Sequence, residues 1–122
     1  MSLCKWDLAW AGLDPAQGHE HAGRRPVLLF CNDAIAPPIG LVSVLPLTTW
    51  KKGRRIYPTE VLLQAGTAGL DSPSLVLCHQ IRTLAASRLF APFGHLAQPG
   101  LRQAVNKALA LWLDLGPASI LR

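Results

Sequence analysis

The chain has 122 residues and a mass of 13.2 kDa, enough for one domain with a buried core. Half of its residues are apolar, which excludes a disordered chain, and no run approaches the roughly 18 apolar residues of a transmembrane helix. Lys and Arg number 12 against seven Asp and Glu, a formal net charge of +5, although only 16% of the residues are charged. A chain that has few charged residues but a clear excess of basic ones predicts an anionic partner. Because the amino terminus lacks the pattern of a signal sequence, we expect a cytoplasmic protein without a membrane anchor.

Short segments rich in β-forming residues, separated by Pro and Gly, predict a mainly β protein. The expected strands span residues 7–13, 26–31, 41–47, 59–64, 74–78 and 81–84. Pro26 fits only at the start of its strand, where a missing N–H does least harm. The three cysteines are odd in number and widely spaced, so we expect reduced and mostly buried thiols.

The last predicted element is a helix that begins near Pro99 and stops at Gly116 and Pro117. Its apolar face is Leu101, Ala104, Val105, Ala108, Leu111, Trp112 and Leu115, which follow helical spacing. Leu109 and Leu113 lie off that stripe, where they could cover a second neighbour such as a partner subunit. Many strands followed by one helix predict a largely antiparallel sheet or small barrel with the helix packed on it.

The loop at residues 18–26 precedes a predicted buried strand and is rich in titratable groups. It contains His19, Glu20, His21, Arg24 and Arg25. Cleavage of a phosphodiester needs a group that exchanges a proton and fixed positive charge near the phosphorus, and Arg25 is well anchored for the second role. The alternative is a solvated loop whose charges happen to cluster, which composition alone favours. The histidine spacing matches no tetrahedral zinc pattern, so no metal is expected.

A second candidate is the basic stretch of residues 51–55. It contains Lys51, Lys52, Arg54 and Arg55. Four basic side chains around a glycine are typical of a mobile loop that binds phosphates. The neighbouring Trp50 could stack on an unpaired nucleobase. The alternatives are a loop kept polar for solubility and a tryptophan that belongs partly to the core.

A third candidate follows the predicted strand at residues 74–78. His79, Gln80 and Arg82 have side chains long enough to reach a ligand. His79 titrates near neutrality and could serve as a general base. The alternative, a hydrogen-bonded structural histidine, is the more common outcome for a lone histidine after a strand.

These segments, in this order, resemble the MazF/PemK (Kid) family of toxins from type II toxin–antitoxin pairs. Residues 7–15 are similar to the family's opening D-(hydrophobic)-W segment that ends in D-P, and residues 18–27 to its G-[HS]-E-x-x-G-x-R-P segment. Residues 46–48 and 80–83 match two further short motifs. The resemblance covers almost the whole chain and implies one toxin domain, residues 1–122. The implied fold is an SH3-like barrel of twisted antiparallel strands with helices outside.

The resemblance implies an endoribonuclease that cuts single-stranded RNA at a short sequence and needs neither metal nor cofactor. The family's essential arginine falls on Arg25, its essential threonine on Thr48 and its loop glutamate on Glu20. The RNA 2′-OH would attack the adjacent phosphorus, leaving a 2′,3′-cyclic phosphate and a 5′-OH. The general base stays open among Glu20, His19 and His79.

Further parts of the chain match regions that contact substrate in the family. The segment from His79 to Arg82 corresponds to a substrate-lining region, and the basic loop at residues 51–55 to one that varies and sets the recognised sequence. One departure concerns the first strand: the glycine that usually precedes the opening Asp7 is Trp6 here. This puts the start of that strand in question.

The resemblance also implies partners. The family works as a homodimer and is neutralised by a cognate antitoxin, whose acidic tail would lie across the basic groove. Two alternatives share the fold. One is a non-enzymatic toxin that poisons DNA gyrase, as CcdB relatives do, although residues 116–122 lack the tryptophan that those proteins carry there. The other is a catalytically inactive RNA-binding module.

Overall fold

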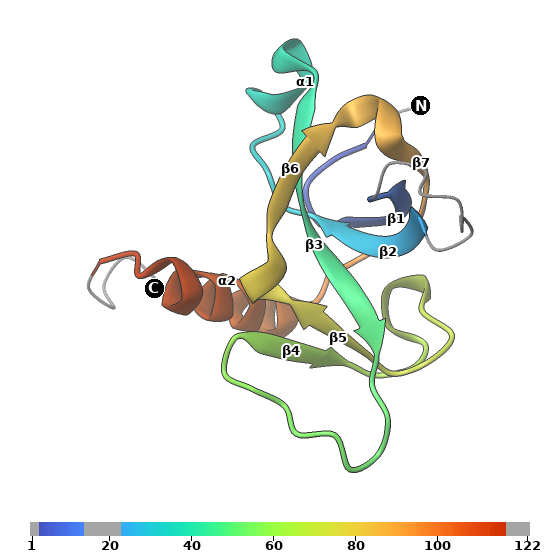
Figure 1. Cartoon of the computed structure of the whole chain (residues 1–122), viewed down its shortest axis with the longest axis vertical. Coiled ribbons are helices and arrows are strands. Elements are labelled where there is room, and N and C mark those ends of the chain that lie inside the picture. The colour runs from blue at the N-terminus through green and yellow to red at the C-terminus, as the bar shows by residue number, and fades with distance from the viewer. Residues whose placement is uncertain (1–2, 14–22, 117–122) are drawn as a thin grey trace.

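A computed structural model of the chain describes residues 3–13 and 23–116. Seven strands form one antiparallel sheet in the order β4-β5-β3-β2-β1-β7, and β6 pairs with β3 off this path (Figure 1). The strands are β1 (Asp7–Gly12), β2 (Arg24–Leu29), β3 (Leu41–Thr49), β4 (Glu60–Leu63), β5 (Ser74–Leu77), β6 (Arg82–Ala85) and β7 (Leu89–His95). Helix α1 (Ala36–Ile39) precedes β3, and helix α2 (Pro99–Leu113) follows β7. The predicted mainly β class with one carboxyl-terminal helix is confirmed.

The sheet has a hydrophobic core on each face. Because strand side chains alternate between faces, neighbouring residues of one strand enter different cores. Leu8, Leu28, Leu45 and Leu47 belong to the core that α2 covers. The second core contains Ala9, Ala11, Val27, Leu29, Val42 and Val44. Both faces of β1, β2 and β3 are therefore occupied along most of their length.

Strand β7 is the main element that the sequence did not reveal. It pairs with β1 from Asp7 opposite His95 to Ala11 opposite Leu89, with two register shifts on the way. Pro92 lies inside this strand, although proline is usually rare within strands. The register shifts on either side of the Ala9–Pro92 pair accommodate it. The strand also contains Gly94, where an added Cβ would overlap the carbonyl oxygen of Ala68.

Helix α2 faces the sheet differently from the prediction. Val105, Ala108 and Leu109 are buried in the core, so the expectation that Leu109 covers a partner is wrong. The three residues predicted for the end of the buried face, Leu111, Trp112 and Leu115, are about half exposed. Leu113 is exposed, so the prediction that it covers a partner subunit remains a prediction. The predicted apolar face of the helix is therefore one turn too long. Helical spacing alone does not show where the sheet beneath a helix ends.

Strand β2 begins two residues earlier than predicted. Pro26 is its third residue and lies opposite Trp10 of β1, so the expectation that it opens the strand is wrong. The earlier start has a consequence for function, because it places Arg24 and Arg25 within the strand. Before β3 the chain forms the single helical turn α1, which Gly40 closes at a φ of 78°.

Trp6 occupies the position where the resemblance places a glycine. Its φ is 78°, in the left-handed region that favours glycine, and strand β1 begins at the next residue. The indole is 8% exposed and packs edge-to-face on Phe30 with ring centroids 5.3 Å apart. Packing of this large ring offsets the backbone strain, and the first strand starts where the motif places it.

Candidate functional site

Arg25 and Thr48 occupy neighbouring strands at the same level of the sheet. Strands β2 and β3 pair with Val27 opposite Pro46, and the same register continued by two residues places Arg25 opposite Thr48. The guanidinium nitrogen Nη2 of Arg25 donates to the carbonyl oxygen of Leu47 at 3.4 Å. Both side chains are half-buried. The fold thus brings together the two residues that the resemblance marks as essential.

Arg82 lies on the same face of the sheet as this pair. It is opposite Val44 of β3, and Val44, Pro46 and Thr48 share one face by alternation. We call Arg25, Thr48 and Arg82 the basic face. Positive charge beside a threonine hydroxyl, with no acid in the group, is suited to a phosphate.

Arg24 does not join the basic face. It precedes Arg25 in β2, so its side chain points to the opposite side of the sheet. There its guanidinium carbon lies 4.4 Å from the ring centroid of Phe90 and 5.7 Å from that of Trp10. These are cation–π contacts, which give Arg24 a packing role on that side.

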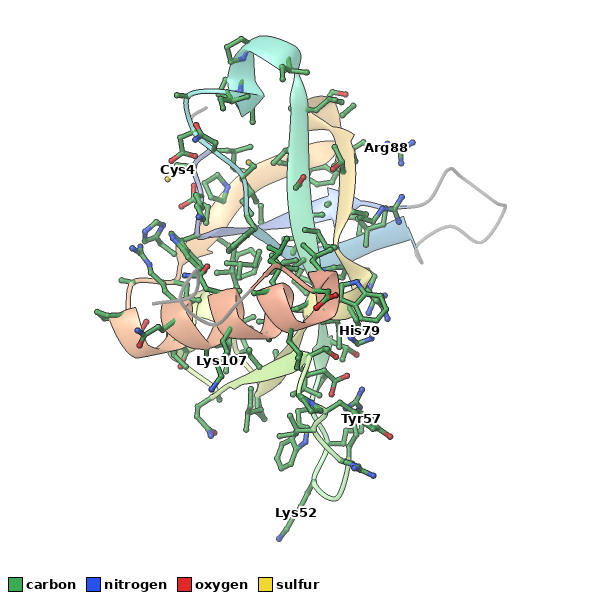
Figure 2. The ribbon with its side chains drawn as sticks, turned by 90° about the vertical axis from the view of Figure 1, so that its left-hand side faces the viewer. Cys4, Lys52, Tyr57, His79, Arg88 and Lys107 are labelled. Carbon is green, nitrogen blue, oxygen red and sulfur yellow. The ribbon has the colours of Figure 1, made fainter. Side chains whose placement is uncertain are left out.

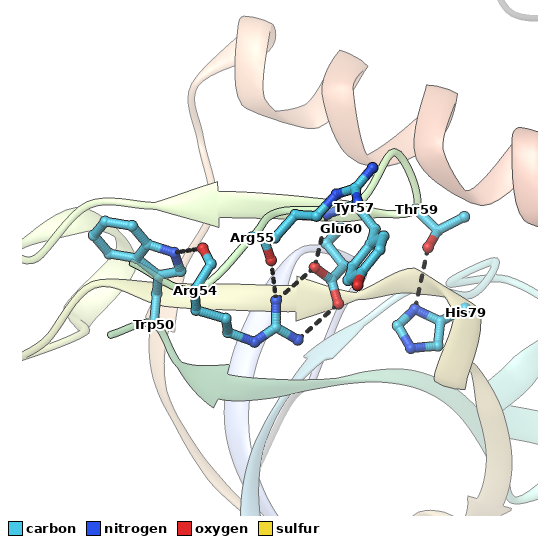
Figure 3. A network of polar contacts seen from close by, with 7 residues as sticks. All are labelled: Trp50, Arg54, Arg55, Tyr57, Thr59, Glu60 and His79. Carbon is cyan, nitrogen blue, oxygen red and sulfur yellow. Dashed lines mark hydrogen bonds and ion pairs between the residues drawn. The ribbon is translucent and has the colours of Figure 1, made fainter. Parts of the chain in front are cut away.

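His79 and Gln80 lie in a short 3₁₀ turn, Cys78–Gln80, between β5 and β6. His79 is half-buried, and its Nδ1 lies 3.2 Å from the hydroxyl of Thr59 (Figure 3). Its ring also packs edge-to-face on Trp112. Gln80 is exposed. Contacts on two sides orient the imidazole of His79, as a structural histidine requires, and leave Nε2 as the nitrogen for any proton transfer.

Cys78, the first residue of that turn, is fully buried, whereas Cys4 and Cys31 are half-buried. None of the three forms a disulfide in the part of the chain that the structure describes. Cys4 and Cys31 are more exposed than the sequence analysis predicts. Burial, with a smaller contribution from the charge of Glu60, raises the pKa of the Cys78 thiol to about 12. This cysteine is therefore a small apolar core residue and not a nucleophile.

An ion pair organises the basic loop between β3 and β4 (Figure 3). The Arg54 guanidinium donates to both carboxylate oxygens of Glu60, at 2.9 and 3.0 Å. The Glu60 side chain is 2% exposed and also accepts the backbone N–H of Tyr57 at 3.0 Å. The hydrogen bonds from Arg54, joined by that from Tyr57, hold the pKa of Glu60 below its usual value despite burial. Glu60 is thus a buried, ionised anchor for the loop.

The other bases of this loop face solvent. Lys51, Lys52 and Arg55 are exposed and contribute charge beside the basic face. Trp50 is half-buried, and its indole N–H donates to the carbonyl oxygen of Arg54 at 2.9 Å. Trp50 and Arg54 therefore both have structural contacts within the loop, in addition to the substrate contact predicted for them.

We expect replacement of Glu60 by glutamine to destabilise the fold at neutral pH. The folded-state pKa of Glu60 is lowered, so its contribution is complete above the unfolded-state value near 4.3 and is lost as pH falls through the folded-state value. Thermal unfolding of Glu60→Gln should show a lower Tm than the parent at pH 7. The difference should shrink below about pH 4. An equal difference at pH 7 and at pH 3 would contradict this assignment.

One cluster away from the basic face contains potential metal ligands. Ligand atoms of Cys4, Asp7 and His95 lie within 4.8 Å of one another. However, His95 Nδ1 is 2.7 Å from Asp7 Oδ1, and the Arg102 guanidinium is 3.0 Å from His95 Nε2. A guanidinium this close repels a cation, so the cluster serves as a hydrogen-bonded tie between β1, β7 and α2.

Two predicted site residues, Glu20 and His19, lie outside the described residues. Two residues that matter to the loop were missed: Glu60, its anchor, and Tyr57, its exposed aromatic ring. One signal was present, because Glu60 is the only acid between Asp33 and Asp71 and follows four bases closely. Within the described ranges, neither α-helix is long and apolar enough to span a bilayer.

Comparison with known proteins identifies relatives of the whole chain. The chain is 38% identical over 108 residues to endoribonuclease MazF9 of Mycobacterium tuberculosis, covering 84% of this chain and 89% of the relative. It is 31% identical over 112 residues to endoribonuclease MazF of Staphylococcus saprophyticus, covering 89% of each. A solved mycobacterial endoribonuclease in complex with its cognate antitoxin superposes with a TM-score of 0.75 at 26% identity, covering 95% of this chain and 99% of that one. Residues 5–113 match the model of the PemK-like, MazF-like toxins of type II toxin–antitoxin systems, and the chain belongs to this family.

Proposed function

We propose that this chain is an endoribonuclease toxin that cleaves single-stranded RNA at a short sequence without metal. The observation that carries the proposal is the position of Arg25 opposite Thr48, on a face that also bears Arg82. Its kinship with curated endoribonucleases adds support. The excess of basic residues suits the polyanionic substrate.

In the proposed reaction the 2′-oxygen of a ribose attacks the adjacent phosphorus. The new O2′–P bond forms as the P–O5′ bond breaks, which leaves a 2′,3′-cyclic phosphate on one fragment and a 5′-OH on the other. Arg25 stabilises the additional negative charge of the phosphorane, and the Thr48 hydroxyl donates to a phosphate oxygen. Because arginine is almost always protonated, we assign Arg25 this electrostatic role and not that of a proton donor to O5′.

Two protons move in this reaction. A general base removes the 2′-OH proton, and a general acid returns one to O5′. Glu20, His19 and His79 are the candidates for the base. Nδ1 of His79 lies beside the Thr59 hydroxyl, so Nε2 is the nitrogen that would accept the 2′-OH proton. The pH profiles of cleavage by the His19→Gln, Glu20→Gln and His79→Gln variants separate these three candidates.

The proposal includes two protein partners. A cognate antitoxin would compete with RNA for the basic face through an acidic segment, as suits a toxin of this family. A second copy of the chain would cover the exposed apolar end of α2, where Leu111, Trp112 and Leu113 are 58%, 51% and 43% exposed. Sedimentation of the chain alone and with the antitoxin measures both associations.

The proposal is tested with purified protein, a long unstructured RNA and excess EDTA. We expect fragments whose 5′ ends map to one short motif and accept phosphate from a polynucleotide kinase without prior phosphatase treatment. A salt-dependent complex without fragments would favour the inactive RNA-binding module instead. Inhibition of DNA supercoiling without RNA cleavage would favour the gyrase poison.

A further inference from the structure

The loop between β3 and β4, residues 50–59, extends away from the sheet (Figure 1). We call it the β3–β4 finger. We propose that the finger is a preformed platform on which one unpaired RNA base stacks against Tyr57, and that Arg54 and Glu60 are positioning residues for it. This inference rests on the proposed function, because it specifies how the same substrate is held beside the basic face.

The tip of the finger is closed by its own backbone. The N–H of Arg54 donates to the carbonyl oxygen of Lys51 at 2.9 Å, and Gly53 between them has a φ of 94°. The Trp50 indole then ties the start of the finger to the carbonyl oxygen of Arg54. A turn with a left-handed glycine and two closing hydrogen bonds has a defined shape before any ligand binds.

The base of the finger is anchored in the protein by Glu60. Its nearly buried carboxylate binds the Arg54 guanidinium through two hydrogen bonds. Tyr57 is fixed at both backbone groups: its N–H donates to the Glu60 carboxylate at 3.0 Å, and its carbonyl oxygen accepts the Glu60 N–H at 2.9 Å. The position of Tyr57 therefore depends directly on Glu60.

The Tyr57 ring is available to a ligand. It is 49% exposed, and the guanidinium carbon of Arg55 lies 5.0 Å from its centroid. Lys51 and Lys52 are exposed on the same finger, with Lys52 at its tip (Figure 2). Proteins that bind single strands combine basic side chains along the backbone with aromatic rings on which bases stack. The finger has both, on a framework that needs little ordering on binding.

This arrangement changes the roles predicted within the basic stretch. Trp50 is less exposed than Tyr57, and its N–H is engaged inside the finger, so Tyr57 is the better stacking surface. Arg54 directs its guanidinium to Glu60 and to the Arg55 carbonyl oxygen, so it shapes the finger. Lys51, Lys52 and Arg55 remain for the phosphates.

The test measures binding of a twelve-nucleotide, unstructured 2′-O-methyl RNA by fluorescence anisotropy. Its blocked 2′-oxygen prevents cleavage. We expect Tyr57→Ala to weaken binding roughly tenfold and to leave the salt dependence unchanged, because stacking is not ionic. Tyr57→Phe should bind as the parent does. Lys52→Ala should reduce the slope of log K against log salt by about 0.7, because one phosphate contact is lost.

A neighbouring variant controls for general damage to the finger. Ile56 is 39% exposed beside Tyr57 but has no ring, and Ile56→Ala should bind within about twofold of the parent. The platform is refuted if Tyr57→Ala binds as tightly as Ile56→Ala, or if Tyr57→Phe binds as weakly as Tyr57→Ala.

The positioning role of Glu60 has a separate readout. If Glu60 acts through Tyr57, Glu60→Gln should weaken binding in the parent but add little to Tyr57→Ala, so that the two effects are not additive. Additive effects would refute the positioning role. Arg54→Gln provides the same comparison should Glu60→Gln fail to fold. The probe cannot be cleaved, so the binding results test the platform independently of catalysis. Absence of RNA cleavage by the parent in the cleavage assay would reject the proposed function.

Discussion

Replacement of Arg25 by alanine is expected to reduce RNA cleavage by at least about 10²–10³-fold, with little change in stability. Preorganised charge at a developing oxyanion contributes this much in other enzymes, and Arg25 is the half-buried cation that the β2–β3 register places opposite Thr48. Its hydrogen bond to the Leu47 carbonyl oxygen is long, at 3.4 Å, so its loss should disturb the sheet only slightly. The rate is measured under single-turnover conditions on an oligonucleotide that contains the mapped motif.

The neighbouring Arg24 provides a matched control. It has the same charge and the adjacent position in β2 but lies on the opposite side of the sheet, against Phe90. Arg24→Ala should therefore retain most of the cleavage rate, although both variants lose one positive charge. Arg25→Lys keeps the charge but loses the planar fork, so an intermediate rate is expected. Equal losses for Arg24→Ala and Arg25→Ala would mean that only net charge matters.

Replacement of Gly94 by alanine is expected to destabilise the fold by about 3 kcal/mol or more. A Cβ on Gly94 would overlap the carbonyl oxygen of Ala68, a backbone atom that cannot rotate away. Strand β7 and the turn at Thr67–Gly69 would have to separate, which would weaken the pairing of β7 with β1. For a domain of this size the expected change in Tm is a decrease of roughly 10 °C, measurable by circular dichroism.

Gly100 is the control for this substitution. An added Cβ there meets no atom within 4 Å, and the residue lies in the first turn of α2. Gly100→Ala should leave the stability unchanged or raise it by about 0.4–1 kcal/mol, because alanine restricts the unfolded chain. A mild effect at Gly94, equal to that at Gly100, would show that β7 can shift without loss.

Local patterns were sufficient for most of the sheet. Runs of β-forming residues bounded by Pro and Gly placed β1, β3 and β5 to within two residues. Strand β7 was missed because Pro92 and Gly94 interrupt the pattern, and the segment becomes extended through its pairing with β1, in which Ala11 lies opposite Leu89 and Asp7 opposite His95. Long-range pairing overrides local preference, and it leaves no trace in the segment itself.

The candidate site was predicted as a set of residues but not as a geometry. Arg25 and Thr48 came from the motifs, whereas their juxtaposition depends on the register of β2 against β3. Arg24 and Arg54 looked equivalent to their neighbours in sequence. Strand alternation turns Arg24 away from the basic face, and Arg54 binds the carboxylate of Glu60, six residues away. Neither distinction follows from charge counting, because each depends on where a side chain points.

The pairing of the first strand with the last gives the chain a particular order of assembly. The Asp7–His95 contact spans 88 residues, so β1 has only β2 as a neighbour until β7 is available. Closing so long a loop is entropically slow, and topologies dominated by such contacts fold slowly. A nascent chain in which β7 has not left the ribosome exposes an unpaired sheet edge and lacks the cover of α2. Synthesis therefore allows an interval in which a protease or a binding partner can act on the chain before it is fully folded.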